Sequence, residues 1–209
     1  FYASLGHSCW AWEPHYGPFG GDDLYVATTA LAFGVALSPD RSWLAYTTVG
    51  VCGPAATAEY DKMNLCLVNL NTKEKTCHSD VNYQNPDFAP SGNWLVFAAD
   101  FSGQYEIWKA QVQDDGSLTN LTQLTRSSDG KWSLYPAWSS DGNWVIFARG
   151  TPADDDVRLP DIQNPQLYVV RADGSSLRAL GISGEEPAWY GGGPGAMNYH
   201  LYLPVVLKQ

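Results

Sequence analysis

Three short stretches of the sequence are nearly the same, and this repetition constrains the fold more than any other feature. They read SPDRSWLAY at 38–46, APSGNWLVF at 89–97 and SSDGNWVIF at 139–147. Their tryptophans, Trp43, Trp94 and Trp144, lie 51 and 50 residues apart. A unit that recurs at a fixed spacing of about 20–50 residues indicates a solenoid, a propeller or another repeat array.

Each repeat predicts two β-hairpins. A tight turn, such as Asp141-Gly142, separates a short apolar segment from an apolar run that ends in an aromatic residue, which is typical of two antiparallel strands. A second hairpin follows in every unit. We expect its two-residue turn at Asn71-Thr72, Asp115-Gly116 and Asp173-Gly174, because such turns need positive φ and Asp-Gly supplies it. The sequence therefore predicts four antiparallel strands per unit and no helix.

Four antiparallel strands at a repeat of about 50 residues are the pattern of a β-propeller blade. The run YPAWSSDGNWVIFARG at 135–150, followed by QLYVVRADGSSLRAL at 166–180, resembles the repeat of TolB-type propellers. The resemblance covers roughly residues 23–190 and implies an all-β fold with about four four-stranded blades. It also implies an interaction platform. Similar propellers accompany peptidases and polysaccharide lyases, so the fold indicates function only weakly.

The chain divides into an arm, a repeat region, a linker and a terminal strand. These are residues 1–22, rich in aromatic residues, Gly and Pro; 23–190; the Gly-rich 191–199; and 200–209. The repeat units are 35–77, 85–125 and 135–180, with a partial fourth at 186–190. We expect segments 23–28 and 200–207 to complete that last blade, either in their own chain or in a neighbouring subunit.

Four cysteines without a Cys-x-x-Cys pair predict two disulfides rather than a zinc site. Three pairings are possible, and the hairpin selects one of them. With its turn at 71–72, Cys66 and Cys77 face each other, which suits a short disulfide. Cys9 then pairs with Cys52 and joins the arm to the first unit. Disulfides indicate a secreted protein, extracellular or at the cell surface, with the periplasm as an alternative.

The composition is that of a folded, acidic domain. Aromatic residues make up 13% of the 209 residues, whereas disordered chains have few. A net charge of −10 disfavours nucleic acid and anionic membranes, because phosphates repel such a surface. No apolar run reaches the ~20 residues of a membrane-spanning helix. Because the chain starts at Phe1, we expect that a signal peptide or a longer upstream region has been removed.

No catalytic constellation is visible, so we expect no enzymatic activity. A Gly-x-Ser-x-Gly elbow is absent from the sequence, and none of its four histidines lies in a metal-spaced pair. The long connections 48–62 and 149–165 should emerge on one face, where loops on a rigid scaffold carry function. Four acids of the second loop are candidate ligand-binding residues: Asp154, Asp155, Asp156 and Asp161. We favour a solvated acidic loop over a calcium site at 153–161, and expect no other cofactor.

Two further features have a structural interpretation that we prefer. Phe88, Trp138 and Trp189 occupy equivalent positions in their units, and we expect them to be core between blades rather than a platform for sugars. Asn120 lies in the only N-glycosylation sequon, Asn-Leu-Thr. The sequon carries information only if the source organism glycosylates proteins.

The favoured hypothesis is a non-enzymatic secreted protein that assembles with itself, as an oligomer or an extracellular fibre. A strand on a flexible linker can add to a neighbour's sheet edge, and head-to-tail contacts that do not close produce filaments. The candidate interface residues are Trp10, Trp12, Tyr16 and Phe19 of the arm and Leu201, Tyr202, Leu203, Val205, Val206 and Leu207 of the tail. The alternative is a closed monomeric propeller that binds a protein or glycan on its long-loop face. A fragment of a hydrolase or lyase is a less favoured third hypothesis.

Overall fold

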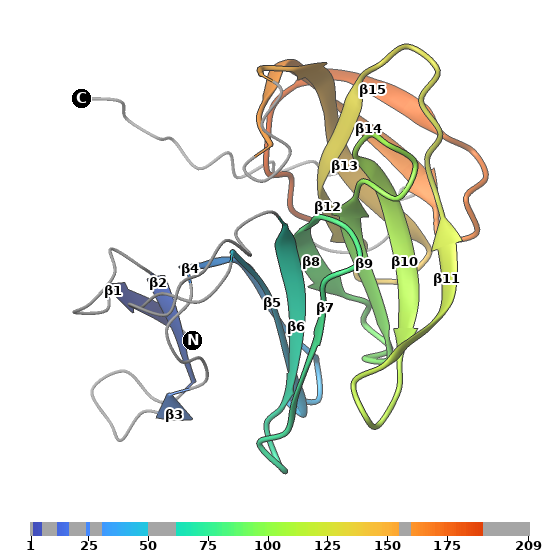
Figure 1. Ribbon diagram of the computed structural model, residues 1–209. Coiled ribbons are helices and arrows are strands. Elements are labelled where there is room, and N and C mark those ends of the chain that lie inside the picture. The colour runs from blue at the N-terminus through green and yellow to red at the C-terminus, as the bar shows by residue number, and fades with distance from the viewer. Residues whose placement is uncertain are drawn as a thin grey trace.

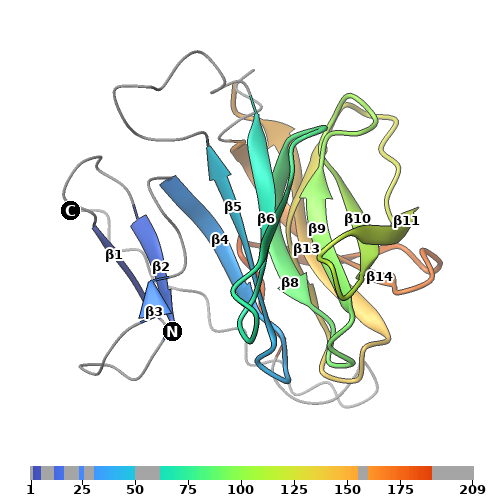
Figure 2. The same cartoon turned by 60° about the horizontal axis from the view of Figure 1, so that its bottom comes forward.

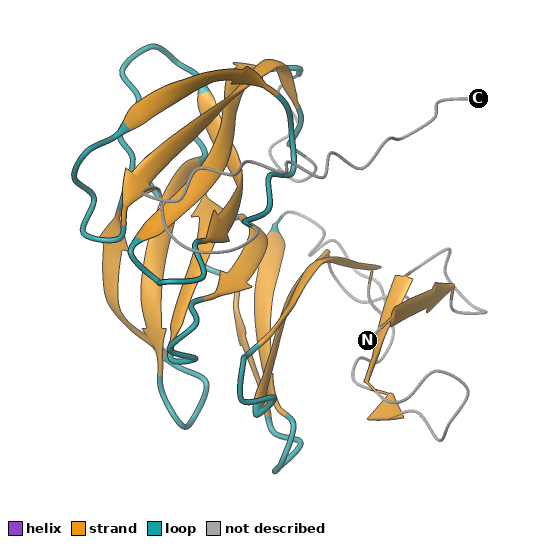
Figure 3. Cartoon of the chain, turned by 180° about the vertical axis from the view of Figure 1, so that it is seen from behind, coloured by secondary structure: helices purple, strands orange, loops and turns teal. Residues whose placement is uncertain are grey.

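The computed structural model confirms the predicted all-β propeller fold (Figure 1). It describes residues 2–5, 12–16, 24–25, 31–49, 62–154 and 160–189. Three four-stranded antiparallel sheets stack face to face, and a three-stranded sheet lies beside the first of them (Figures 1 and 3). In the described part of the chain, no helix is long and apolar enough to cross a membrane.

Each of the three full repeat units forms one blade, and its strands pair in chain order. Blade 1 contains β4 (Leu31–Leu37), β5 (Trp43–Val49), β6 (Met63–Asn69) and β7 (Lys75–His78). Blade 2 contains β8 (Tyr83–Phe88), β9 (Trp94–Ala99), β10 (Glu106–Val112) and β11 (Leu118–Gln123). Blade 3 contains β12 (Trp132–Trp138), β13 (Trp144–Pro152), β14 (Ile162–Arg171) and β15 (Arg178–Ser183). The first strands of neighbouring blades contact each other, β4 with β8 and β8 with β12. Figure 2 shows β4 and β8 in blades 1 and 2.

The core lies between the blades, because alternate residues of each strand face opposite neighbours. Leu67, Phe88 and Phe97 belong to the cluster between blades 1 and 2. Trp138 and Phe147 belong to the cluster between blades 2 and 3. Phe88 and Trp138 are 6% and 7% exposed, which confirms their predicted place in the core.

The turns inside the blades define two faces of the propeller. Turns that join first to second strands and third to fourth strands emerge on one side, which we call the turn face. Connections from second to third strands, and from blade to blade, emerge on the opposite side, the long-loop face. This division follows from antiparallel pairing and agrees with the prediction from the sequence.

The second hairpins have longer turns than predicted. In blades 2 and 3 the loops are the three residues 114–116 and 172–174, closed by Gln113 N–H to Ser117 O and Arg171 N–H to Ser175 O bonds of 3.0 and 2.9 Å. The predicted glycines do have positive φ, 76° at Gly116 and 85° at Gly174. They occupy the last position of a three-residue loop rather than a two-residue turn.

The hairpin of blade 1 carries the predicted disulfide. Its loop has four residues, 70–73, with Lys73 at φ 67°. A four-residue loop centred on the same point as a two-residue turn keeps the same register, so Cys66 still pairs with Cys77. Their Cα atoms lie 4.1 Å apart and the sulfurs are bonded. Such a bond is typical of an extracellular or periplasmic protein. The other predicted partners, Cys9 and Cys52, lie outside the described residues.

The N-terminal region differs from the prediction. It contains three strands that form one antiparallel sheet: β1 (Tyr2–Leu5), β2 (Trp12–Tyr16) and β3 (Leu24–Tyr25). We expected segment 23–28 to pair in the last blade, but Leu24–Tyr25 pairs with β2, which is close in sequence and therefore has a lower entropic cost of loop closure. Within the fourth unit, residues 186–189 form no strand. Segment 200–207 lies outside the described residues.

Blades 1 and 2 also touch at their outer rims. Thr76 Oγ1 donates a 2.8 Å hydrogen bond to Asp115 O, and His78 Nε2 lies 3.0 Å from Gly116 O. A Cβ atom added to Gly116 would lie 2.8 Å from Thr76 Cβ, closer than side chains approach. The hairpin of blade 2 therefore packs against β7 at a distance that only glycine permits.

Candidate binding site on the propeller axis

One backbone irregularity recurs in all four units. The equivalent residue of each unit has a positive φ: 48° at Gly34, 48° at Asn85, 57° at Tyr135 and 47° at Glu186. These residues follow one another at spacings of 51, 50 and 51. In the three blades this residue makes a β-bulge in the first strand, where the pairing register shifts. A bulge bends the strand and redirects a side chain, and bulges are frequent beside functional sites.

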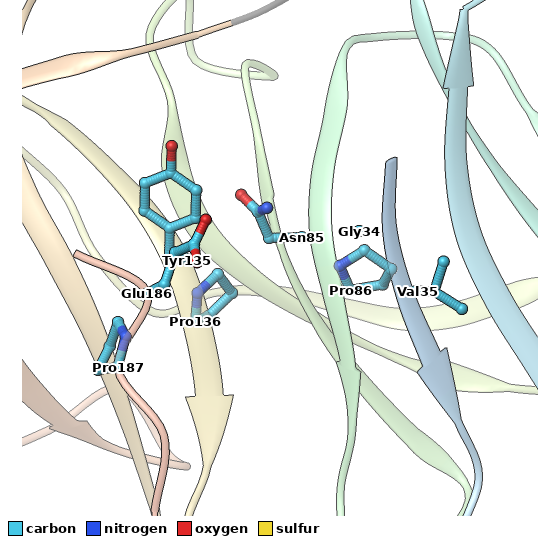
Figure 4. Close-up of a pocket in the computed structure, with 8 residues that line it drawn as sticks. All are labelled: Gly34, Val35, Asn85, Pro86, Tyr135, Pro136, Glu186 and Pro187. Atoms are coloured by element: carbon cyan, nitrogen blue, oxygen red, sulfur yellow. The ribbon is translucent and has the colours of Figure 1, made fainter. Parts of the chain in front are cut away.

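These four residues line one pocket of about 320 Å³, which we call the axial pocket (Figure 4). The residues that follow them complete the lining: Val35, Pro86, Pro136 and Pro187. In Figure 4 the side chains of Asn85, Tyr135 and Glu186 extend toward the same end of the pocket. Proline is suited to a bulge because it has no N–H to give to the ladder. The pocket thus combines proline walls with an amide, a phenol and a carboxylate.

The bulge strains every residue except glycine. A left-handed backbone costs a non-glycine residue roughly 1–2 kcal/mol. Gly34 is favoured for a second reason, since a Cβ there would lie 3.0 Å from Asn85 Cα, a tighter contact than most side chains make. Strain of this kind persists where the surrounding structure enforces it, and it clusters at functional sites.

The electrostatic environment of the axial pocket is acidic. Burial raises the pKa of the Tyr135 phenol to about 12, and the negative charges of Glu185, Asp161 and Glu186 act in the same direction. The hydroxyl therefore stays neutral at physiological pH. Asp161 and Glu185 belong to connections on the long-loop face. Asp161 Oδ1 accepts a 2.8 Å hydrogen bond from Ile162 N–H, and its carbonyl accepts one of 2.9 Å from Ala153 N–H.

The predicted ligand loop contributes one residue to this environment. Asp161 is close enough to influence Tyr135, whereas Asp154 is exposed on the loop. Asp155 and Asp156 lie outside the described residues. Among the residues that the structure describes, no three His, Cys, Asp or Glu side chains are grouped to hold a metal ion. The preference for a solvated acidic loop over a calcium site at 153–161 stays a prediction.

The remaining predicted residues lie away from the axis. Asn120 is exposed on β11 at φ 53°, and its Nδ2 donates a 2.9 Å hydrogen bond to Gln111 Oε1. Trp12 and Tyr16 belong to β2. The other candidate interface residues lie outside the described ranges: Trp10, Phe19, Leu201, Tyr202, Leu203, Val205, Val206 and Leu207.

The bulge residues were missed by the sequence interpretation. The signal was present, because three of the four precede a proline at the repeat spacing: Asn85-Pro86, Tyr135-Pro136 and Glu186-Pro187. The repeated tryptophans, by contrast, indicate the turns before the second strands. A proline inside a predicted strand indicates a bulge or an edge, and this rule identifies the axial positions.

Comparison with known proteins places this geometry in a fold family. No protein-family model matches the chain. An uncharacterized protein of Agrobacterium fabrum is 30% identical over 98 residues, which are 44% of this chain and 31% of that relative. A structure assigned as TolB from Agrobacterium tumefaciens superposes with a TM-score of 0.64 at 19% identity, covering 84% of this chain and 58% of the other. TolB from Acinetobacter baumannii gives 0.61 at 13% identity, covering 88% and 42%.

The chain has the TolB-type β-propeller fold. This confirms the resemblance inferred from the repeats, and the low identities restrict the likeness to the fold. The chain spans about a third of the curated relative and roughly half of the two TolB structures. In the TolB-type propeller described here, the axial pocket is therefore interpreted from its own residues.

Proposed function

We propose that this TolB-type propeller is a non-catalytic binding module whose axial pocket receives a lysine or arginine side chain of a partner protein. One observation carries the proposal. Four positions with the same backbone conformation present different side chains to a single pocket, from Gly34 to Glu186. The fold requires only the bulge at these positions, so the side chains are available for recognition.

The chemistry of the pocket favours a cation. Glu186 offers a carboxylate, and Asn85 and Tyr135 offer uncharged oxygen atoms. Proline rings beside them suit the methylene stem of a lysine or arginine, which packs on apolar surface while its charged end stays polar. The net charge of −10 attracts cationic partners over a longer range.

Fluorescence anisotropy with labelled peptides tests the proposal. The peptides are identical except for one central residue: Arg, Lys, Gln or Leu. We expect the Arg and Lys peptides to bind more tightly than the other two. Glu186→Gln or Tyr135→Phe should weaken their binding at least about tenfold, which corresponds to the loss of one charge-assisted hydrogen bond.

A matched control separates the pocket from general electrostatics. Glu74→Gln removes the same charge from an exposed loop on the turn face. This variant should bind like the wild type. Equal losses in Glu186→Gln and Glu74→Gln, or equal binding of the Gln and Arg peptides, would refute a cation site on the axis.

Self-assembly is a second candidate, and the fourth unit favours it. Trp189 Nε1 donates a 3.1 Å hydrogen bond to Ala137 O, and Glu186 has the backbone of its counterparts. Yet this unit forms no strand in the described residues. A strand from 200–207, of the same chain or of a neighbour, can complete it by pairing.

Sedimentation velocity decides between the two sources of that strand. Concentration-dependent oligomers of the intact chain that disappear in a version ending at Gly195 would support strand exchange. A monomer at every concentration would contradict it, and a loss of stability on truncation would then place the strand in its own chain.

A further inference from the structure

A second pocket lies between blades 2 and 3 and shares no residue with the axial pocket. Its volume is about 250 Å³, and it lies among turns of the turn face. We call it the inter-blade pocket. The residues that matter for its chemistry are Pro90, Trp94, Lys109, Trp138, Asp141 and Ala172.

The repeat itself shows that this pocket is not required by the fold. Lys109 pairs with Val96 as Leu67 pairs with Ala45 in blade 1. Ala172 N–H bonds to Asn143 O as Val112 N–H bonds to Asn93 O, both at 2.9 Å. Lys109 and Ala172 are therefore the counterparts of Leu67 and Val112.

Between blades 1 and 2, those counterparts help to form a packed core. Leu67 and Val112 are 0% and 8% exposed, and they belong to one apolar cluster with Phe88, the counterpart of Trp138. Between blades 2 and 3, a lysine and an alanine stand in place of the leucine and the valine. The pocket follows from these two residues rather than from the architecture.

Two residues that line the inter-blade pocket carry a hydrogen-bond donor for which the described part of the chain supplies no acceptor. Lys109 Nζ lies 4.5 Å from the centre of the Trp94 ring, and no acceptor or ion pair for it occurs among the described residues. Trp138 is 7% exposed, and its Nε1–H has no partner. A buried donor left unpaired costs about 1–3 kcal/mol. Burial lowers the pKa of the Lys109 ammonium, and Asp173 opposes that change.

The nearby carboxylates already have donors of their own. Asp141 Oδ1 accepts hydrogen bonds from Ser139 Oγ and Asn143 N–H, at 2.6 and 3.0 Å. Asp173 Oδ1 accepts a 2.9 Å bond from Ser175 N–H. The acids thus serve their own turns, and among the described residues neither forms an ion pair with Lys109, on which Asp173 acts only over a longer distance.

We propose that the inter-blade pocket binds a small organic carboxylate with a ring-sized body, its acid group on Lys109 Nζ and its body against Trp138 and Pro90. A carboxylate accepts a charge-assisted hydrogen bond from an ammonium, which is roughly twice as strong as a hydrogen bond between neutral groups. The size fits, because a cavity of about 150 Å³ already holds benzene. Indole and proline surfaces suit either an aromatic ring or the apolar face of a sugar.

Saturation-transfer NMR and calorimetry with two pairs of probes test this. Benzoate is compared with benzamide, and glucuronate with glucose, so that each pair differs in its charged group. Dissociation constants of about 0.1–10 mM are expected for ligands of this size. We expect each acid to bind at least about tenfold more tightly than its neutral partner. Whichever of benzoate and glucuronate binds more tightly shows whether the pocket prefers an aromatic ring or a sugar.

Two substitutions locate the site, and each introduces the residue that occurs at the equivalent position of the preceding blade. Lys109→Leu introduces the residue found at position 67 and should abolish the preference for the acid. Ala172→Val introduces the residue found at position 112 and should weaken acid and neutral probe alike by filling the pocket. Lys75→Leu, at an exposed lysine of β7, is the matched control and should change nothing.

Three results would overturn the proposal. They are equal affinity for acid and neutral probe, acid binding that survives both substitutions, and equal losses in Lys109→Leu and Lys75→Leu. Loss of folding cannot imitate the result expected for Lys109→Leu, because that variant should still bind the neutral probe, which an unfolded chain would not.

Discussion

Arg41 has a left-handed backbone conformation at a turn position where the other two repeat units have glycine. Its φ is 60°, and the corresponding turn residues Gly92 and Gly142 have 86° and 70°. Its N–H makes the same turn bond, 2.9 Å to Ser38 O. Because the left-handed region costs roughly 1–2 kcal/mol and glycine gains flexibility in the unfolded chain, Arg41→Gly should raise the free energy of unfolding by about 0.5–1 kcal/mol. Urea denaturation measures this change.

The reciprocal substitution provides the control. A Cβ on Gly142 would meet only Pro90 Cδ, at 3.8 Å, so the space is open and the backbone alone opposes a side chain. Gly142→Arg should therefore destabilise by about 1 kcal/mol. A loss of stability in Arg41→Gly would show that the arginine side chain contributes more than the strain costs.

Asp87 gives the protein a pH dependence of unusual sign. Its Oδ2 accepts a 2.7 Å hydrogen bond from Trp138 N–H of the next blade, and burial raises its pKa from the usual 3.8 to about 6. The folded state then binds more protons than the unfolded state between these values, so this residue's contribution to stability falls as pH rises from about 4 to 6. Asp87→Asn keeps an acceptor oxygen and removes the charge. The variant should be more stable than the wild type at pH 7, by roughly 1–3 kcal/mol, and equal to it near pH 4.

Asp141→Asn should show the opposite trend. The hydroxyl of Ser139, with the Asn143 N–H, lowers the pKa of Asp141. Its contribution is present above the usual pKa of a carboxyl group and is lost as pH falls below it. Denaturation of both variants between pH 3 and 7 measures how the free energy of unfolding changes with pH in each. If this free energy has the same pH dependence in the wild type and in Asp87→Asn, the pKa of Asp87 is not raised.

At the scale of the element, the disulfide stabilises the hairpin of blade 1. It joins residues 11 apart, and a loop of this length predicts about 3 kcal/mol from the reduced entropy of the unfolded chain. Cys66→Ala with Cys77→Ala should lower the free energy of unfolding by roughly 2–3 kcal/mol in guanidinium denaturation. A change below about 0.5 kcal/mol would mean that the hairpin is already ordered in the unfolded state.

The strands were predictable because each depends on a local signal. The repeated Ser and Asp of the first turn serve one purpose: Ser139 Oγ donates to Asp141 Oδ1, and Trp144 N–H donates to Ser139 Oγ. Alternating apolar residues after that turn then specify the second strand. Loop lengths were less predictable, since two-, three- and four-residue loops use the same glycine or polar residues.

The bulge positions have a local signal, the proline that follows three of the four, but their meeting in one pocket was not predictable from it. That meeting depends on how closely neighbouring blades approach each other, as the short distance between Gly34 and Asn85 illustrates. Asp161 and Glu186 both act on Tyr135, although they belong to different loops of the chain. The acidic loop was predicted only as a candidate ligand loop, and the position of Asp161 beside the axial pocket required the structure.

At the scale of the whole molecule, stability depends on how well the blades pack. The double variant Lys109→Leu with Ala172→Val copies the packed interface of blades 1 and 2 onto that of blades 2 and 3. We expect a gain of roughly 1–2 kcal/mol, because a desolvated lysine is removed and a cavity is filled. Thermal unfolding measures it as a higher Tm.

The reverse exchange tests the same reasoning. Leu67→Lys with Val112→Ala creates a cavity and places an ammonium at a position that is 0% exposed. It should destabilise by about 3 kcal/mol or more. If both double variants lose stability equally, the two interfaces are not interchangeable.

The contact at the outer rims of blades 1 and 2 can influence how these blades approach each other at the axis. Thr76 and Gly116 touch at the outer edge, while Gly34 and Asn85 approach each other at the inner edge of the same two blades. A side chain at position 116 would therefore push the outer edges of the two sheets apart and rotate the sheets about the core between them. We therefore expect a substitution at Gly116 to change the distance between Gly34 and Asn85 in the axial pocket, although position 116 does not line that pocket.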